Sequence, residues 1–169
     1  MQNNIKTAVL GREVLLTLAF TGVATLAPLV HSQLVTGTLV NAALFAAVML
    51  MGFRAAAAVA LVPSLIALAV GTLPVAMAAM IPYIMASNVA LAGVFALLKR
   101  TNYWLAAGAA GLVKFALLVV SASAILKALT HGKIALALVS MMGWPQLITA
   151  LLGAVLAWVL FERKSFKKS

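Results

Sequence analysis

Residues 103–129 read YWLAAGAAGLVKFALLVVSASAILKAL. The run is almost entirely apolar, and Lys114 is its only charged residue before Lys127. An α-helix needs about 20 apolar residues to cross a bilayer, and the run does not alternate with the period of two that a barrel strand requires. We therefore expect a membrane-spanning helix here, with a lysine near its middle.

Similar apolar runs fill the rest of the chain. Of its 169 residues, 66% are hydrophobic and 8% are charged, whereas about a quarter of a soluble domain is charged. This composition excludes a soluble enzyme and a disordered chain. The sequence has no cysteine, which excludes a disulfide scaffold and any zinc or iron–sulfur site held by thiolates.

Six spans can be drawn, which leaves room only for short connections. The sequence therefore predicts an all-α integral membrane protein: one domain, residues 1–169, forming a compact bundle of six transmembrane helices. The second span could start as early as Leu34, and we expect a break in the last one near Trp144 and Pro145, where proline removes a backbone donor. The predicted spans are residues 14–30, 39–51, 55–70, 75–98, 103–129 and 134–161.

The charges are distributed unevenly between the two sides of this bundle. Lys and Arg total 12 against two acids, and only Lys127 and Lys133 fall on the side of the predicted outward connections. By the positive-inside rule, both termini are expected in the cytoplasm, which makes the chain a multi-pass protein of the cell (inner) membrane. Without interleaved aromatic residues, the basic residues do not predict a nucleic-acid partner. The opposite side carries Lys6, Arg12, Arg54, Lys99, Arg100, Arg163, Lys164, Lys167 and Lys168.

The first apolar run has a second interpretation. Lys6 and Arg12 precede it, as basic residues precede the apolar part of a signal peptide. A patterned polar stretch follows the run rather than a soluble domain, so a membrane-spanning helix is expected.

Lys114 is the most informative residue. At about 1.5 Å per residue it lies about 16 Å from Tyr103, half the thickness of the hydrocarbon, where an ammonium costs about 2.5–3.5 kcal/mol. The two acids, Glu13 and Glu162, lie at predicted span ends. The hydrogen-bond partners of the lysine must therefore be hydroxyls, carbonyls, water or a ligand. Either the lysine is uncharged without a ligand or it lies in a wet cavity. In both cases the carboxylate of a bound solute would supply its missing partner. The alternative is a purely structural lysine held by helix-end carbonyls.

Further polar and aromatic side chains fall in the middle or outer half of the predicted spans. They predict one outward-open pocket for a small, anionic or acceptor-rich solute. The amides are expected to bond the solute, the aromatic rings to stack on it, and the polar side chains of the outward loop at residues 31–38 to gate it. Separate interhelical bonds and an ordinary solvated loop are the alternatives. These candidates are Asn41, Asn88 and Gln146; Tyr83 and Trp144; and His31, Gln33 and Thr36.

The sequence shows no catalytic or metal-binding motif beside these candidate residues. The sequence has no phosphate-binding loop, no zinc-binding helix motif and no pair of carboxylates within a span, and His31 and His131 stand alone. We predict no catalytic residue, no metal and no cofactor.

Three segments carry a resemblance to a known family. They are residues 29–41 (LVHSQLVTGTLVN), 82–88 (PYIMASN) and 142–146 (MGWPQ). The chain resembles the substrate-binding S components of energy-coupling factor (ECF) vitamin transporters, in particular a poorly characterised bacterial group among them. The resemblance implies a vitamin or precursor bound at the outer loops and outer helix halves. It also implies that the first helices dock onto a membrane scaffold subunit driven by two cytoplasmic ATPases.

The docking surface departs from that family's pattern. Its first span usually carries small alanines at every fourth position, whereas this chain has Thr17, Thr21 and Thr25. These threonines are expected either to dock the scaffold or to pack inside the bundle.

Taken together, the sequence predicts a substrate-binding membrane subunit of an ECF-type ATP-driven importer rather than an enzyme. Two alternatives stay open: a self-sufficient small channel or facilitator, and a membrane-embedded assembly factor or enzyme. The last would have Lys114 as its only reactive group.

Overall fold

The computed structural model describes residues 2–70, 75–128 and 140–162. These segments are helical throughout apart from short connections, and no strand occurs among them. The elements are α1 (Gln2–Leu26), η1 (Ala27–Val30), α2 (Gln33–Leu50), α3 (Phe53–Ala69), η2 (Val75–Met80), α4 (Ile81–Leu98), α5 (Tyr103–Ala128), α7 (Trp144–Ala157) and η3 (Trp158–Glu162).

The helical segments confirm the prediction of an all-α protein with helices suited to a membrane. Five are long and apolar enough to cross one, while α3, with 17 residues, is shorter. At about 1.5 Å per residue α3 is about 26 Å long, slightly less than the hydrocarbon core. A sixth crossing therefore depends on α3. The five longer segments are Leu10–Val30, Gln33–Leu50, Ala78–Leu98, Tyr103–Ile125 and Ser140–Phe161.

Several predictions fall outside the described residues. These include the outward connections at residues 71–74 and 130–133 with His131, the first part of the last predicted span, and the basic residues after Glu162.

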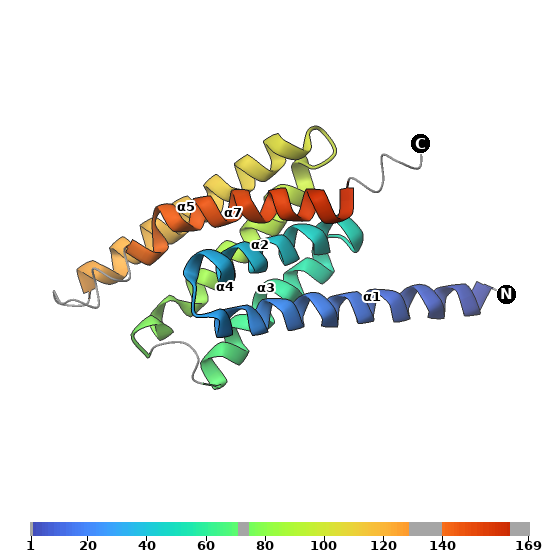
Figure 1. The fold of residues 1–169 in the computed structure, drawn as a ribbon, viewed down its shortest axis with the longest axis horizontal. Coiled ribbons are helices and arrows are strands. Elements are labelled where there is room, and N and C mark those ends of the chain that lie inside the picture. The colour runs from blue at the N-terminus through green and yellow to red at the C-terminus, as the bar shows by residue number, and fades with distance from the viewer. Residues whose placement is uncertain (1, 71–74, 129–139, 163–169) are drawn as a thin grey trace.

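α2 is the central helix of the bundle. It packs against α1, α3, α4 and α7, while α5 packs against α4 and α7. In Figure 1, α1 runs along one edge of the bundle and α5 along the opposite edge, and α1 begins at the same end at which η3 finishes. The two ends of a chain lie on the same side of a membrane when the chain crosses it an even number of times.

The core is built from small side chains around a few large ones. All residues of α2 from Asn41 to Val48 are buried, and the ring of Phe45 meets that of Phe95 edge to face, with centroids 4.8 Å apart. Buried alanines, such as Ala56 and Ala106, lie where the helices contact one another. They occur on every described helix except η2 and η3. Small residues let helix backbones approach closely, which is how membrane helices associate without a hydrophobic driving force.

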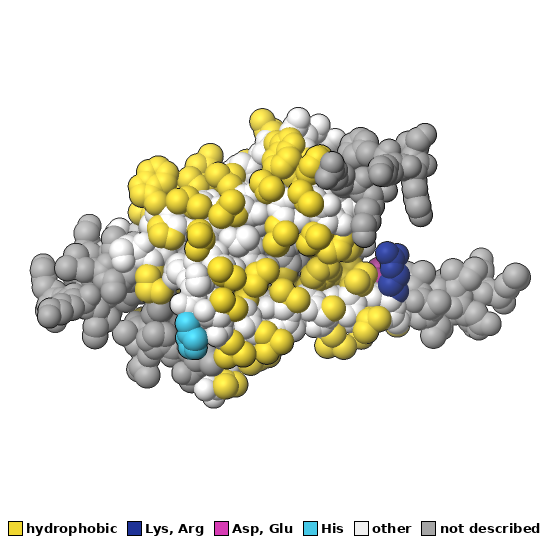
Figure 2. All heavy atoms as spheres, in the orientation of Figure 1, with side chains coloured by type: hydrophobic (Ala, Val, Ile, Leu, Met, Phe, Trp, Pro, Cys, Tyr) yellow, Lys and Arg dark blue, Asp and Glu magenta, His cyan; other side chains and the backbone are white. Residues whose placement is uncertain are grey.

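The outer surface carries the larger apolar side chains. Figure 2 shows hydrophobic side chains spread over the visible face, and the basic side chains that it colours lie near one end. Leucines on α1, such as Leu15 and Leu18, are more than half exposed. A surface of this kind suits lipid rather than water.

Two connections between helices are very short. Met51 and Gly52 separate α2 from α3, and Gly52 has a φ of +90°, a backbone region that glycine adopts without strain. At the other connection on this end, Asn102 precedes α5, and its Oδ1 accepts a hydrogen bond from the Leu105 N–H at 3.0 Å. Asn102 therefore caps the N-terminus of α5.

Replacing Asn102 by alanine is expected to lower the free energy of unfolding by about 1 kcal/mol, because a helix-terminal N–H loses its acceptor. Asn102→Asp, which keeps a side-chain acceptor, is the matched control. Thermal unfolding in detergent measures both. Equal losses in the two variants would show that the cap is not what stabilises this end of α5.

The structure corrects the predicted outward loop at residues 31–38. Only His31 and Ser32 lie outside helices there, and α2 already begins at Gln33. The Thr-Gly-Thr sequence at residues 36–38 favours a turn, but Gly37 lies directly against Thr149 of α7. Close packing of the two helices therefore overrides the local turn preference.

The predicted break in the last span is present and lies at Gly143. Its backbone leaves the helical region, and α7 starts at Trp144, with Pro145 in the first turn. Proline is tolerated there because the first N–H groups of a helix have no partner within it. The feature is a helix start rather than a kink inside a continuous helix.

Candidate functional site

Lys114 lies at the middle of the apolar segment Tyr103–Ile125, as the sequence predicts, and is buried with 4% of its surface exposed. Its Nζ donates hydrogen bonds to Asn41 Oδ1 at 2.6 Å and to Asn88 Oδ1 at 2.7 Å. Three helices, α2, α4 and α5, thus meet at one ammonium. Within the part of the chain that the structure describes, no carboxylate contacts it.

The network continues onto a fourth helix through Thr149. Asn41 Nδ2 donates to Thr149 Oγ1 at 3.3 Å, and this hydroxyl donates to the Gln146 carbonyl oxygen at 3.1 Å. Asn41 and Thr149 are both at most 1% exposed. Each polar group therefore has a partner in a region where an unpaired one would be costly.

Gln146 and Gln33 are brought together at a different point. Both side chains donate through Nε2 to the carbonyl oxygen of Met141, at 3.2 Å and 2.9 Å. Gln33 opens α2, whereas Asn41 lies two turns further along the same helix. A series of hydrogen bonds thus runs along the α2–α7 contact from the start of α2 to Lys114.

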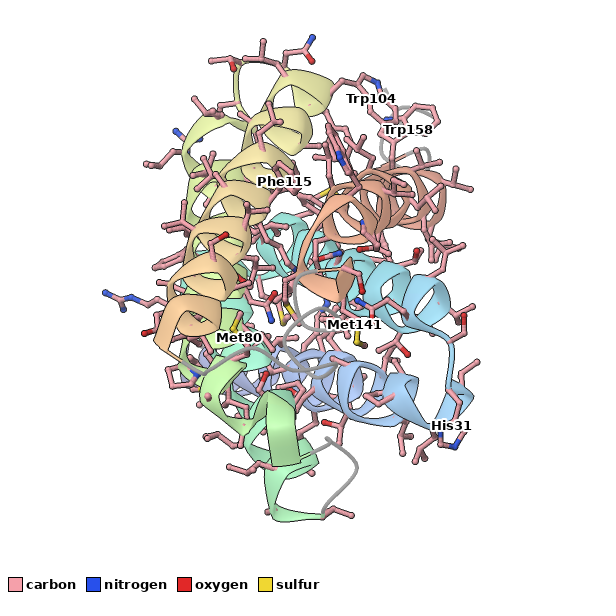
Figure 3. All side chains as sticks on the ribbon, turned by 90° about the vertical axis from the view of Figure 1, so that its left-hand side faces the viewer. His31, Met80, Trp104, Phe115, Met141 and Trp158 are labelled. Atoms are coloured by element: carbon pink, nitrogen blue, oxygen red, sulfur yellow. The ribbon has the colours of Figure 1, made fainter. Side chains whose placement is uncertain are left out.

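The predicted gate residues have separate positions. Thr36 donates through Oγ1 to the Ala27 carbonyl oxygen at 2.9 Å and so ties α2 to η1. His31 is exposed, adopts a left-handed backbone with φ of 53°, and lies at the edge of the bundle in Figure 3. Only Gln33 of this group joins the hydrogen bonds that lead to Lys114.

The two rings predicted to form an aromatic wall are not paired with each other. Trp144 is 68% exposed and packs against Phe115, with centroids 5.2 Å apart, while Tyr83 is 44% exposed. Trp144, Phe115 and Pro145 line an open, largely apolar pocket of about 330 Å³ between α5 and the start of α7. Lys114 is not among its lining residues. The stacking partner of Trp144 is therefore a residue of α5 that the sequence analysis did not select.

The threonines of α1 face the bundle. Thr17 Oγ1 donates to the Glu13 carbonyl oxygen. The same hydroxyl lies 3.5 Å from Sδ of Met51, the residue that follows α2. Thr21 is partly buried, and Thr25 Oγ1 is buried with no partner in the described residues. These positions agree with internal packing, and Val14, Leu15 and Leu18 are among the exposed residues of α1.

Besides Phe115, the sequence analysis missed Thr149 and two glycines. A Cβ added at Gly153 would lie 2.7 Å from Asn41 Cβ, and one at Gly37 would lie 2.8 Å from Thr149 Cγ2 and Oγ1. The available signal was the spacing of Gln146, Thr149 and Gly153, which places them near one face of a helix. Both glycines let α2 and α7 approach closely enough for Asn41 to reach Thr149.

Comparisons with known proteins give no family for the chain: no protein-family model, no curated protein and no solved structure matches it.

Proposed function

We propose that the chain is the solute-binding membrane subunit of an ATP-driven importer of the ECF type. In this proposal Lys114 binds a small anionic or acceptor-rich solute. One observation supports it above all: the ammonium lies at mid-helix, is buried, and is held only by amide oxygens among the described residues.

The two amide oxygens accept hydrogen bonds from the ammonium but do not neutralise its charge. An ammonium has three protons to donate, and Asn41 and Asn88 accept two of them. An amide oxygen is a dipole, whereas a carboxylate would neutralise the charge in a region where charge is costly. A solute carboxylate bonded to Nζ is therefore the natural partner, and Asn41 and Asn88 orient the lysine for it.

The series of hydrogen bonds supports an approach from the start of α2. Gln33 and Gln146 meet at Met141, close to the pocket that Trp144 and Pro145 line. Its volume of about 330 Å³ falls within the range of small-molecule sites. The solute would enter near these residues, stack on Trp144, and reach Lys114 by replacing the bonds along α2 and α7.

The energy for import would come from partner subunits, a scaffold and two cytoplasmic ATPases, as the resemblance implies. Because the threonines of α1 face inward, the scaffold would contact the outer face of α1. That face carries Leu15 and Leu18.

Native mass spectrometry of the detergent-purified protein tests the binding function. We expect a co-purified small molecule, and we expect Lys114→Gln to weaken its binding at least about tenfold, since hydrogen bonds to charged groups contribute about 1.5–3 kcal/mol. Ser121→Ala on the same helix is the control, because its hydroxyl bonds only the Leu117 carbonyl oxygen of α5 itself. Unchanged affinity in Lys114→Gln would refute the role of Lys114.

A second measurement separates the importer subunit from the facilitator. The identified solute is offered to vesicles that contain the chain alone. We expect binding without accumulation inside the vesicles, because import requires the partner subunits. Sustained uptake by the chain alone would favour a facilitator instead.

A further inference from the structure

A second pocket lies at the other end of the bundle, where the basic residues gather. It has a volume of about 300 Å³ and is open to the outside. α2 and α4 contribute apolar side chains, η3 contributes a ring, and the short connection between α4 and α5 contributes two cations. The lining residues are Met49, Leu50, Phe95, Lys99, Arg100, Tyr103 and Phe161.

Aromatic residues near this pocket are of the kind found at the boundary between membrane and water. The ring of Tyr103 contacts Phe95 at a centroid distance of 5.3 Å and Trp104 at 5.1 Å, and Trp104 contacts Trp158 at 5.6 Å. Figure 3 shows Trp104 and Trp158 side by side at the edge of the bundle. Tryptophan and tyrosine gather at the level of lipid headgroups, so the pocket opens at that level.

The two cations are held in different ways. Lys99 donates through Nζ to the Val48 carbonyl oxygen at 2.7 Å, which fixes its ammonium beside the end of α2. Arg100 is exposed next to it. A guanidinium and an ammonium at one opening form a site for a phosphate group, since arginine can bond two phosphate oxygens at once.

We propose that this pocket binds an anionic phospholipid of the leaflet that faces the basic end. The phosphate lies between Lys99 and Arg100, and the upper part of an acyl chain lies against Leu50 and Phe161. The proposal is independent of the solute site, because the two sites share no residue. Basic pockets between membrane helices are a known way to recognise acidic headgroups.

Lipid titration of the full-length protein followed by native mass spectrometry tests the proposal. The probes are phosphatidylglycerol and phosphatidylcholine with identical acyl chains. We expect phosphatidylglycerol to bind at least about tenfold more tightly, and we expect Lys99→Gln/Arg100→Gln to remove that preference. Arg100→Gln alone, which keeps the bond from Lys99 to α2, is expected to weaken it severalfold.

Two controls distinguish a site from general attraction of charges. Arg54→Gln removes an exposed cation at the start of α3, at the same end of the bundle but outside the pocket, and it should leave the preference intact. Met49→Trp fills the pocket without changing charge and should reduce binding. A loss in Arg54→Gln equal to that in Arg100→Gln, or full binding in Met49→Trp, would overturn the proposal.

A further experiment distinguishes a lipid from a soluble phosphate compound as the ligand of this pocket. Glycerol 3-phosphate carries the same phosphate chemistry without acyl chains, and we expect it not to displace the bound lipid at millimolar concentration. Displacement by glycerol 3-phosphate would assign the pocket to a soluble ligand and overturn the lipid assignment.

Discussion

Asn41→Ala is expected to lower the free energy of unfolding by about 2–4 kcal/mol. Asn41 accepts from the Lys114 ammonium and donates to Thr149, so the substitution removes one bond to a charged group and one neutral bond. Such bonds contribute about 1.5–3 and 0.5–1.5 kcal/mol respectively. It also leaves a buried ammonium with one acceptor fewer, in a region with little water to replace it.

Unfolding in mixed micelles, followed by helical circular dichroism, measures this loss. Ser123→Ala is the control, because the Ser123 hydroxyl bonds only the Val119 carbonyl oxygen of its own helix. We expect that control to stay within about 0.5 kcal/mol of the unchanged protein.

A double-mutant cycle with Lys114→Met shows whether the loss comes from the lysine. If Asn41 acts by holding the ammonium, Asn41→Ala should cost clearly less once Lys114 is methionine, with a coupling of about 1 kcal/mol or more. Additive losses would mean that Asn41 stabilises the bundle through Thr149 and packing alone. The same cycle with Asn88→Ala tests the second amide.

The sequence was sufficient to predict that Lys114 lies near the middle of a helix and needs polar partners. The apolar run around Lys114 set its depth, and the cost of a charge at that depth required polar partners from other helices. Asn88 and Gln146 were the amides expected at a similar depth, with Asn41 nearer the outer face, whereas the structure bonds Asn41 and Asn88 to the lysine and Gln146 to the Met141 carbonyl oxygen. The structure adds that Asn41 and Asn88 both bond the lysine directly, so the protein itself supplies two of the three acceptors that an ammonium can use.

The sequence was not sufficient to predict the contact between α2 and α7. The relative register of two apolar helices depends on which small residues face each other, and a single sequence contains many alanines and glycines. Gly37 was interpreted as part of a loop, although it lies against Thr149. Thr149 was overlooked because a single threonine in an apolar helix usually bonds its own backbone.

The orientation of α1 follows a rule that could have been applied. In a membrane the larger apolar side chains face lipid, and small or weakly polar ones face other helices. Leu15 and Leu18 accordingly face outward, and Thr17 faces α2. The family resemblance pointed to the threonines as a docking surface, whereas the chemistry of α1 alone favours them as an internal contact.

Gly153→Ala is expected to destabilise the protein by about 1–3 kcal/mol and to weaken solute binding as well. The added Cβ would lie 2.7 Å from Asn41 Cβ and 2.8 Å from the Ala42 nitrogen. Because one of these atoms belongs to the backbone, the clash must separate α2 from α7, and overpacking of this kind costs about 1–3 kcal/mol. The separation also moves Asn41 away from Thr149.

Gly108→Ala is the matched control, because a Cβ at Gly108 meets nothing within 4 Å. Alanine favours a helix over glycine by up to about 1 kcal/mol, so this variant should be unchanged or slightly more stable. Both variants add one methyl group to a glycine within a helix, and they differ in what that methyl meets. A stable Gly153→Ala protein with unchanged solute affinity would show that α2 and α7 can separate without disturbing Lys114. In that case the close contact of the two helices does not position the lysine.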